Sequence, residues 1–420
     1  MHILSLFALL LLSLKINAQS ILIKSATIHN GKGDAPYVAN VLIEKNKIVK
    51  IQKSDISAHA DTTINAEGLH LYPALISLNN ILGLQEAEAI RPTSDFADIG
   101  NFNPHLRTLS SFNTDSKIIP TVFSNGIMYT QCTPRGNYIA GTSSVVKLKA
   151  WNWEDAAIKE DGIHLYFPSE YVQRGWWAEP GKSEKNKDFQ KQLSEVKNFF
   201  NQSKSYYLLK DSNTFNPRYE AMKDVWTGKK NVYIHCRRAK DILNAIQFAQ
   251  EMQIPKVVLT ECDEIYKVLD VVKKYQYPVI LSRTNRLPAN TDDPIKINYE
   301  LPALLEKNNI LYSISAEGDM EAMQSRNLPF MAGMAVPYGL NKESAIKSIT
   351  LNASKILGID NILGSIEENK LASLILSKGD ILDPMTCLIE TLILEGKIYS
   401  TKNFQTELYH KYLEKYGLKN

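Results

Sequence analysis

The sequence predicts an α/β protein: a TIM-like (β/α)8 barrel with a small composite β-sandwich domain to which both termini contribute. Three observations predict it. The middle of the chain alternates strand-like apolar runs with segments of helical periodicity, which is typical of parallel strands joined by crossover helices. Both ends carry only short strand-like runs. The length of 420 residues, with 44% hydrophobic and 22% charged residues, is that of a folded globular chain.

The N-terminal residues 1–18 have the pattern of a cleavable signal peptide. Their apolar run extends from Ile3 to Leu14, which is too short to span a bilayer, and Ala18 offers a small residue at the cleavage position. We therefore expect secretion, to the periplasm or the cell surface of a bacterium, with no stable membrane insertion after cleavage. The alternative is an uncleaved membrane anchor.

The small β-domain is expected from residues 19–70 and 358–402, followed by a tail of residues 403–420. In the first part, two alternating runs flank Lys45-Asn46-Lys47, which indicates a hairpin. In the second part, a similar pair of runs turns at Glu395-Gly396.

The barrel is expected from residues 71–357, and its active groups should lie at the carboxyl-terminal ends of its strands. Helical periodicity separates most of the later strands from one another. The eight candidate strands are Leu71–Leu78, Gly126–Cys132, Gly162–Phe167, Ser205–Lys210, Asn231–Cys236, Lys256–Cys262, Tyr277–Ser282 and Ile310–Ala316.

Charge and cysteine content exclude some functions. The net charge of +3 argues against nucleic acid as a partner, because phosphate binding requires a strongly basic domain. The four cysteines are widely spaced and form no CxxC motif, so we expect buried free thiols rather than a disulfide framework.

The segments that flank the predicted barrel resemble the amidohydrolase superfamily, and most closely its imidazolonepropionase-like branch. The entry reads AEGLHLYPALISL, and the exit runs from Thr350 to Gly358 and then from Gly364 to Glu367. The similarity extends over about residues 20–400. It implies a metal-dependent hydrolase barrel that acts on carbon–nitrogen bonds other than ordinary peptide bonds, in cyclic amides or dipeptide-like substrates.

The first-strand metal ligands of that family are replaced here. The resemblance implies a His-x-His pair after the first strand, single histidines on the fifth and sixth strands, and an aspartate on the eighth. Laid on the family's entry, Ser77 stands at an aspartate position, and Asn79 and Ile81 stand at the two histidine positions.

Later strands keep one of the implied ligands. His235 falls on the first histidine of the family's IHAH pattern, and Arg237 falls on the second. Glu261 stands where the sixth strand should carry a histidine, and Glu317 replaces the aspartate of the eighth strand. The resemblance therefore implies a degenerate metal site.

Three hypotheses remain open for the site. In the first, the metals are lost, and the barrel is a non-catalytic binding or scaffold protein that pairs with an active relative. In the second, His235, Glu261 and Glu317, with Asp319 as a further donor, bind Zn, Mn or Fe and activate a water. In the third, the same residues act as acid and base without a metal.

A small-molecule or peptide-like ligand is expected at this end of the barrel. Arg135 follows the second candidate strand directly, where it could bind a carboxylate or stabilise its own loop. We predict that Arg135, Asn79 and Arg237 contact the ligand. Because barrels of this type often dimerise, we also expect a homodimer or a pair with a related amidohydrolase.

Overall fold

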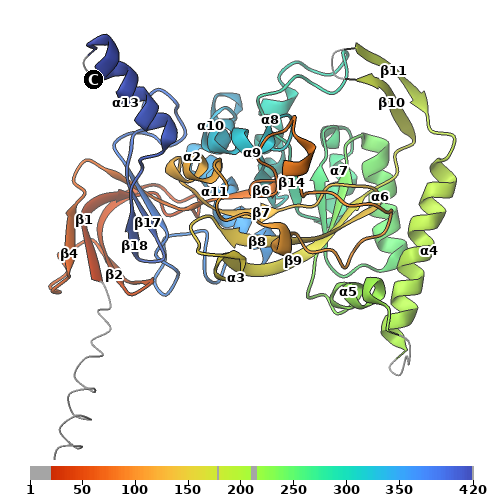
Figure 1. The fold of residues 1–420 in the computed structure, drawn as a ribbon, viewed down its shortest axis with the longest axis horizontal. Helices are drawn as coiled ribbons and strands as arrows, with labels where there is room; N and C mark the ends of the chain where they lie inside the picture. Colours follow the sequence, from red (N-terminus) through yellow and green to blue (C-terminus); the bar gives the residue numbers. More distant parts are fainter. Residues whose placement is uncertain (1–19, 177–178, 210–214, 419–420) are drawn as a thin grey trace, which may run out of the picture.

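The computed structural model describes residues 20–176, 179–209 and 215–418 (Figure 1). The predicted signal peptide of residues 1–18 lies outside the described residues. No helix in these three ranges is both long enough and apolar enough to cross a membrane.

One eight-stranded sheet combines the two ends of the chain and lies at one end of the molecule (Figure 1). Its hydrogen-bonded order is β18-β17-β16-β5-β1-β2-β3, and β4 pairs with β1. The strands are β1 (Ser20–Ile28), β2 (Tyr37–Glu44), β3 (Lys47–Gln52), β4 (Thr62–Asn65), β5 (His70–Pro73), β16 (Leu374–Ser377), β17 (Ile389–Leu394) and β18 (Lys397–Tyr399).

Both predicted hairpin turns are present in this sheet. Glu44 pairs with Lys47 across the first turn, and Leu394 pairs with Lys397 across the second. Gly396 in the second turn has φ of 77°, and a Cβ there would collide with the carbonyl oxygen of Lys45. The two turns therefore pack against each other and join the chain ends.

A second eight-stranded sheet forms the barrel, in the order β15-β14-β13-β12-β9-β8-β7-β6. Seven strands run parallel, and β8 runs antiparallel to both of its neighbours. The strands are β6 (Leu75–Asn80), β7 (Ile127–Cys132), β8 (Ile139–Lys147), β9 (Ala157–Tyr166), β12 (Val232–Cys236), β13 (Val257–Glu261), β14 (Val279–Leu281) and β15 (Tyr312–Ile314). The predicted barrel class is confirmed, with β6 and β15 at the two edges of a nearly closed sheet.

The prediction of a strand at Ser205–Lys210 is wrong. Its described part lies at the end of α4 (Phe189–Leu208) and in the residue that follows. The buried residues of α4 include Val196, Phe199, Phe200 and Ser203, at three- and four-residue spacing, and this helical face continues into the segment. The eighth strand is instead β8, which lies between the second and third candidate strands and was not among them.

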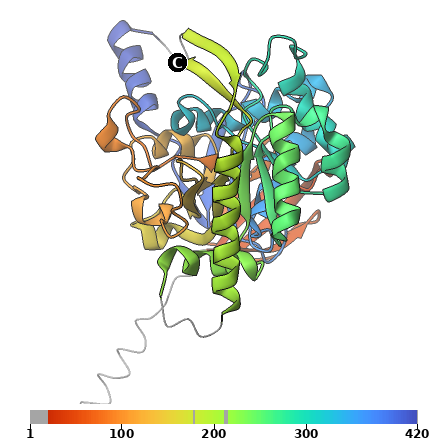
Figure 2. The ribbon, with the colours of Figure 1, turned by 90° about the vertical axis from the view of Figure 1, so that its right-hand side faces the viewer.

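Helices cover the outside of the barrel, and Figure 2 shows α4 running along one side of it. A hairpin of β10 (Tyr171–Trp176) and β11 (Glu179–Lys185) projects beyond the barrel (Figure 1). The other α-helices are α2 (Ile119–Ser124), α3 (Trp153–Ala156), α5 (Pro217–Trp226), α6 (Ala239–Met252), α7 (Leu269–Tyr275), α8 (Ile297–Lys307), α9 (Glu321–Gln324), α10 (Leu328–Gly333), α11 (Lys342–Ser348), α12 (Leu351–Leu357) and α13 (Phe404–Tyr416). Single 3-10 turns are η1 (Arg91–Thr93), η2 (Thr108–Ser111), η3 (Ile265–Lys267), η4 (Ser325–Asn327) and η5 (Val336–Tyr338).

Candidate ligand site at the barrel mouth

The carboxyl-terminal ends of β12 and β13 bring two predicted site residues together. These strands are parallel neighbours, with His235 opposite Thr260 and Cys236 opposite Glu261. Glu261 and Cys262 have φ of 77° and 48°, in the left-handed region that residues with a Cβ rarely adopt. Nδ1 of His235 and Oε1 of Glu261 are 2.9 Å apart.

Both ring nitrogens of His235 are engaged. Nε2 of His235 lies 2.9 Å from Nδ1 of His164 on the adjacent strand β9, and its ring stacks on Tyr166 with centroids 4.1 Å apart. Burial lowers the pKa of both histidines, so each is neutral, with one donor and one acceptor nitrogen. The consistent arrangement has His164 donating to His235, which donates in turn to Glu261.

Arg237 is the centre of a charged group. Its Nε is 2.7 Å from Oε2 of Glu261, its Nη1 is 3.2 Å from Oδ2 of Asp263, and its Nη2 is 2.6 Å from Oε1 of Glu317. The three carboxylate side chains are at most 11% exposed, whereas that of Arg237 is 46% exposed. We call these four residues and His235 the mouth cluster.

Electrostatics favours the charged forms of Glu261 and Arg237. Burial by itself would raise the pKa of Glu261, but the hydrogen bond from His235 and the charges of Arg237 and Arg135 outweigh it and lower the pKa to about 2. Burial opposes the charge of Arg237, yet Glu261, Glu317 and Asp263 together raise its pKa above the ordinary value. The guanidinium therefore balances carboxylates that would be costly to bury alone.

Arg135 and Asn79, both predicted to contact the ligand, are hydrogen-bonded to each other. Nη1 of Arg135 donates to Oδ1 of Asn79 at 2.8 Å, and Nη2 donates to Oε1 of Glu321 at 2.7 Å. Burial raises the pKa of Glu321 to about 7, although Arg135 acts to lower it. Arg135 thus holds the loop after β7 against β6 and α9.

Asp319, the predicted fourth metal donor, lies apart from the cluster. Its side chain is 93% exposed and pairs with Arg283 at 3.4 Å. Gly318 beside it has φ of 136°, and a Cβ there would lie 2.9 Å from Cζ of Arg283. The glycine therefore lets the arginine pack against the backbone.

Sequence reasoning missed three groups of this site. His164 was not among the predicted site residues, although the pairing of β9 with β12 places it next to His235. Asp263 follows Glu261 by two residues and could have been found as a second carboxylate at the same strand end. Glu321 had no sequence signal, because its role depends on the contact with Arg135.

The donors of the cluster do not fit a divalent metal in this arrangement. A metal needs free lone pairs that converge at about 2.0 to 2.2 Å. Glu261 and Glu317 instead share the guanidinium of Arg237, and both nitrogens of His235 have partners. Across the described ranges, no group of three or more His, Cys, Asp or Glu side chains could hold a metal ion.

A hollow of about 330 Å³ opens beside the cluster. Both signs of charge line it, with arginines from the segments after β12 and β14 and acidic residues from the segment after β15. Its lining residues are Arg237, Arg283, Arg286, Glu317, Gly318 and Asp319. Such a surface suits a small ligand that carries both a carboxylate and an amino group.

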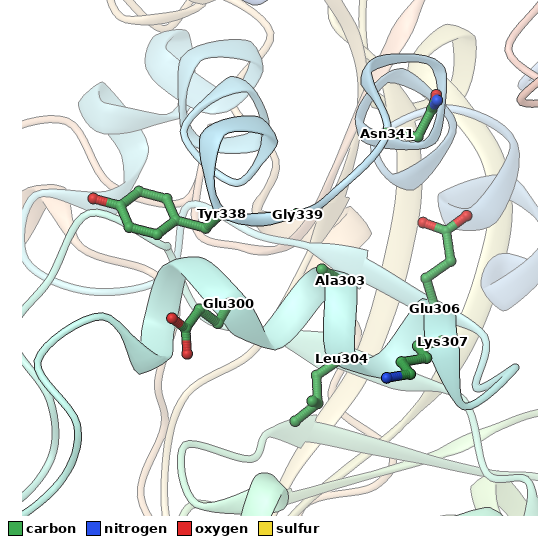
Figure 3. Close-up of a pocket in the computed structure, with 8 residues that line it drawn as sticks. All are labelled: Glu300, Ala303, Leu304, Glu306, Lys307, Tyr338, Gly339 and Asn341. Carbon is green, nitrogen blue, oxygen red and sulfur yellow. The ribbon is translucent and has the colours of Figure 1, made fainter.

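A different hollow, of about 540 Å³, lies between α8 and the turn after η5 (Figure 3). Glu300 and Tyr338 lie at one end of it, and Glu306 and Asn341 lie at the other, so its polar groups do not converge (Figure 3). It shares no lining residue with the mouth hollow. The barrel mouth is therefore the better candidate site.

Comparison with known proteins gives one sequence match. The model of the "Amidohydrolase family" matches residues 303–404. None of the curated proteins searched matches the chain.

Solved structures share the fold. An amidohydrolase from Thermotoga maritima MSB8 has a TM-score of 0.77 and 22% identity, over 90% of this chain and 100% of that chain. A Xaa-Pro dipeptidase with bound methionine has a TM-score of 0.55 and 13% identity, over 91% and 100%. A β-aspartyl dipeptidase from Fervidobacterium islandicum AW-1 has a TM-score of 0.52 and 14% identity, over 91% and 96%. The predicted resemblance is thereby confirmed: in fold over most of the chain, and in sequence over residues 303–404.

Proposed function

We propose that this protein, a relative of the amidohydrolases, binds a small zwitterionic amide or dipeptide-like ligand at its barrel mouth, where an arginine–carboxylate cluster replaces the metal centre. We also propose that residues 1–18 direct its secretion, and that it pairs with a second copy or with an active relative. The observation that carries the proposal is Arg237, which is bonded to three buried carboxylates and is the most exposed group of the mouth cluster.

Charge placement supports the ligand class. The side chains of Arg283 and Arg286 are 20% and 16% exposed beside the half-exposed Arg237. Each is paired with one carboxylate, Asp319 and Asp263 respectively, and its remaining N–H groups would bind a ligand carboxylate. Across the hollow, Glu317 and Asp319 offer acceptors to an amino group. Two similar structures are dipeptidases, which favours a peptide-like ligand.

Hydrolysis of a carbon–nitrogen bond is the second candidate, because the family match and the similar structures belong to hydrolases. The burial of His235, Glu261 and Glu317 argues against their acting directly as general acid or base. The side chains of His235, Glu261 and Glu317 are 2%, 9% and 11% exposed, and each is already hydrogen-bonded or ion-paired. A substrate would have to displace those partners.

Calorimetry and thermal shift with dipeptides, β-aspartyl dipeptides, cyclic amides and free amino acids test the proposal. We expect binding by zwitterionic peptides, a loss of at least tenfold in affinity for Arg283→Met, and no change for the matched variant Lys223→Met. Lys223 forms an exposed pair with Glu220 on α5, away from the mouth lining.

Turnover is measured in the same samples, with and without added Zn or Mn. Hydrolysis that depends on metal and is lost in His235→Ala would refute the binding function and favour the second candidate. Failure of all four ligand classes to bind would refute the ligand assignment.

A further inference from the structure

Two cysteines lie side by side at the strand ends that carry the mouth cluster. Cys236 is the last residue of β12, and Cys262 directly follows β13. The backbone N–H of Cys262 donates to the carbonyl oxygen of Cys236 at 3.1 Å, and the two Sγ atoms are 3.9 Å apart. The side chains are buried, with residue exposures of 3% and 0%.

This geometry suits a covalent bond. Disulfides need Cα atoms about 4.4 to 6.8 Å apart and sulfurs about 2.05 Å apart. Neighbouring strands are separated by about 4.8 Å, and the backbone hydrogen bond between Cys262 and Cys236 shows that the two residues are neighbours of this kind. Small side-chain rotations would therefore bring the sulfurs together.

Little holds the two thiols in their present positions. Each Sγ lies 3.6 Å from the carbonyl oxygen two residues earlier on its own strand, of Ile234 and of Thr260 respectively, and such S–H contacts are weak. The other two cysteines lie elsewhere. Cys132 is on β7, which β8 and β9 separate from β12, and Cys387 precedes β17 in the other sheet.

We propose that Cys236 and Cys262 form a disulfide when the chain folds under oxidising conditions. Two S–H bonds break and one S–S bond forms. Two electrons and two protons pass to an external low-molecular-weight disulfide, such as oxidised glutathione, which leaves as two thiols. Because both sulfurs are buried in the folded protein, and burial raises the pKa of the Cys262 thiol, the exchange takes place during folding, before the barrel closes.

The bridge would tie together the residues of the mouth cluster. Cys236 stands between His235 and Arg237, and Cys262 stands between Glu261 and Asp263. The strand ends that carry these four side chains would then be held covalently as well as by hydrogen bonds. The left-handed backbone at Glu261 and Cys262 would be fixed by the same bond.

Peptide mapping of the full chain without its leader tests the disulfide. The protein is refolded in a mixture of oxidised and reduced glutathione, unfolded in acid, alkylated and cut after Lys and Arg. We expect residues 231–237 linked to residues 257–267, a mass lower by two hydrogen atoms than that of the reduced chain, and alkylation of Cys132 and Cys387 only. The variant with Cys132→Ser and Cys387→Ser should keep the link, and Cys236→Ser should release Cys262 as a free thiol.

Two outcomes would overturn the assignment: alkylation of all four thiols in the correctly refolded protein, or a link that involves Cys132 or Cys387. The wild-type map alone decides the question, so the test does not depend on whether a variant folds.

Discussion

Replacement of Arg237 by Met should destabilise the protein by about 2 to 3 kcal/mol at pH 7. Met keeps the length of the side-chain stem but leaves Glu261, Asp263 and Glu317, each at most 11% exposed, without their shared cation. Removal of one partner of a buried pair costs about 3 to 5 kcal/mol, and an exposed pair contributes about 1 kcal/mol or less. Because the side chain of Arg237 is 46% exposed, water can solvate part of the carboxylate charge that remains after the replacement, and the expected loss of stability falls between these limits.

The assay is guanidinium-induced unfolding of both proteins at several pH values. Glu261 has a folded pKa of about 2, below its ordinary value of 4.5, so its ionised form stabilises the fold above pH 4.5 and that stability is lost as the pH falls toward 2. The difference between wild type and Arg237→Met should therefore shrink over the same range. Lys223→Met is the control for loss of a surface charge. A difference below about 0.5 kcal/mol at pH 7, in the range of an ordinary surface pair, would show that the guanidinium does not hold the carboxylates.

Two further variants test separate parts of the structure. The folded pKa of Glu321 is about 7, above its ordinary value of 4.5, so the folded state retains a proton that the unfolded chain loses between these pH values. The free energy of unfolding should therefore fall as the pH rises from 4.5 to 7, by up to about 3 kcal/mol. Glu321→Gln should remove that slope in denaturant titrations, and an unchanged slope would contradict the assignment. Gly396→Ala should lower the free energy of unfolding by about 2 kcal/mol or more, because it adds a collision with Lys45 to the strain of a positive φ. Gly68→Ala, with φ of 78° and open space, should show the strain alone, and equal losses in the two variants would exclude the collision.

The sequence allowed prediction of seven of the eight barrel strands, because those strands are apolar runs. It failed at β8, where Thr142, Ser143 and Ser144 are polar but at most 1% exposed. Two of them have partners distant in the sequence: Thr142 donates to the carbonyl of Pro104, and Ser143 donates to buried Asp161. A buried strand with polar residues at its centre has no hydrophobic period to detect.

The candidate site could be predicted only in outline. The resemblance to amidohydrolases pointed to His235, Glu261 and Glu317, and the rule that parallel strand ends meet at one face grouped them. Which groups they bond to depends on backbone turns and rotamers, such as the left-handed exit at Glu261. The contact of His235 with His164 and the role of Arg237 between three carboxylates therefore required the structure.

Arg237 explains how this barrel mouth keeps its buried carboxylates. Buried carboxylates need a cation, and Arg237, directly after β12, contacts all three of them, while Arg286 also pairs with Asp263. A guanidinium has no lone pair to offer and stays protonated, so it can orient an anion but cannot activate a water as a metal does. Arg237 thus balances the charge of the cluster without supplying a metal ligand. For that reason we place ligand binding ahead of hydrolysis in the proposed function.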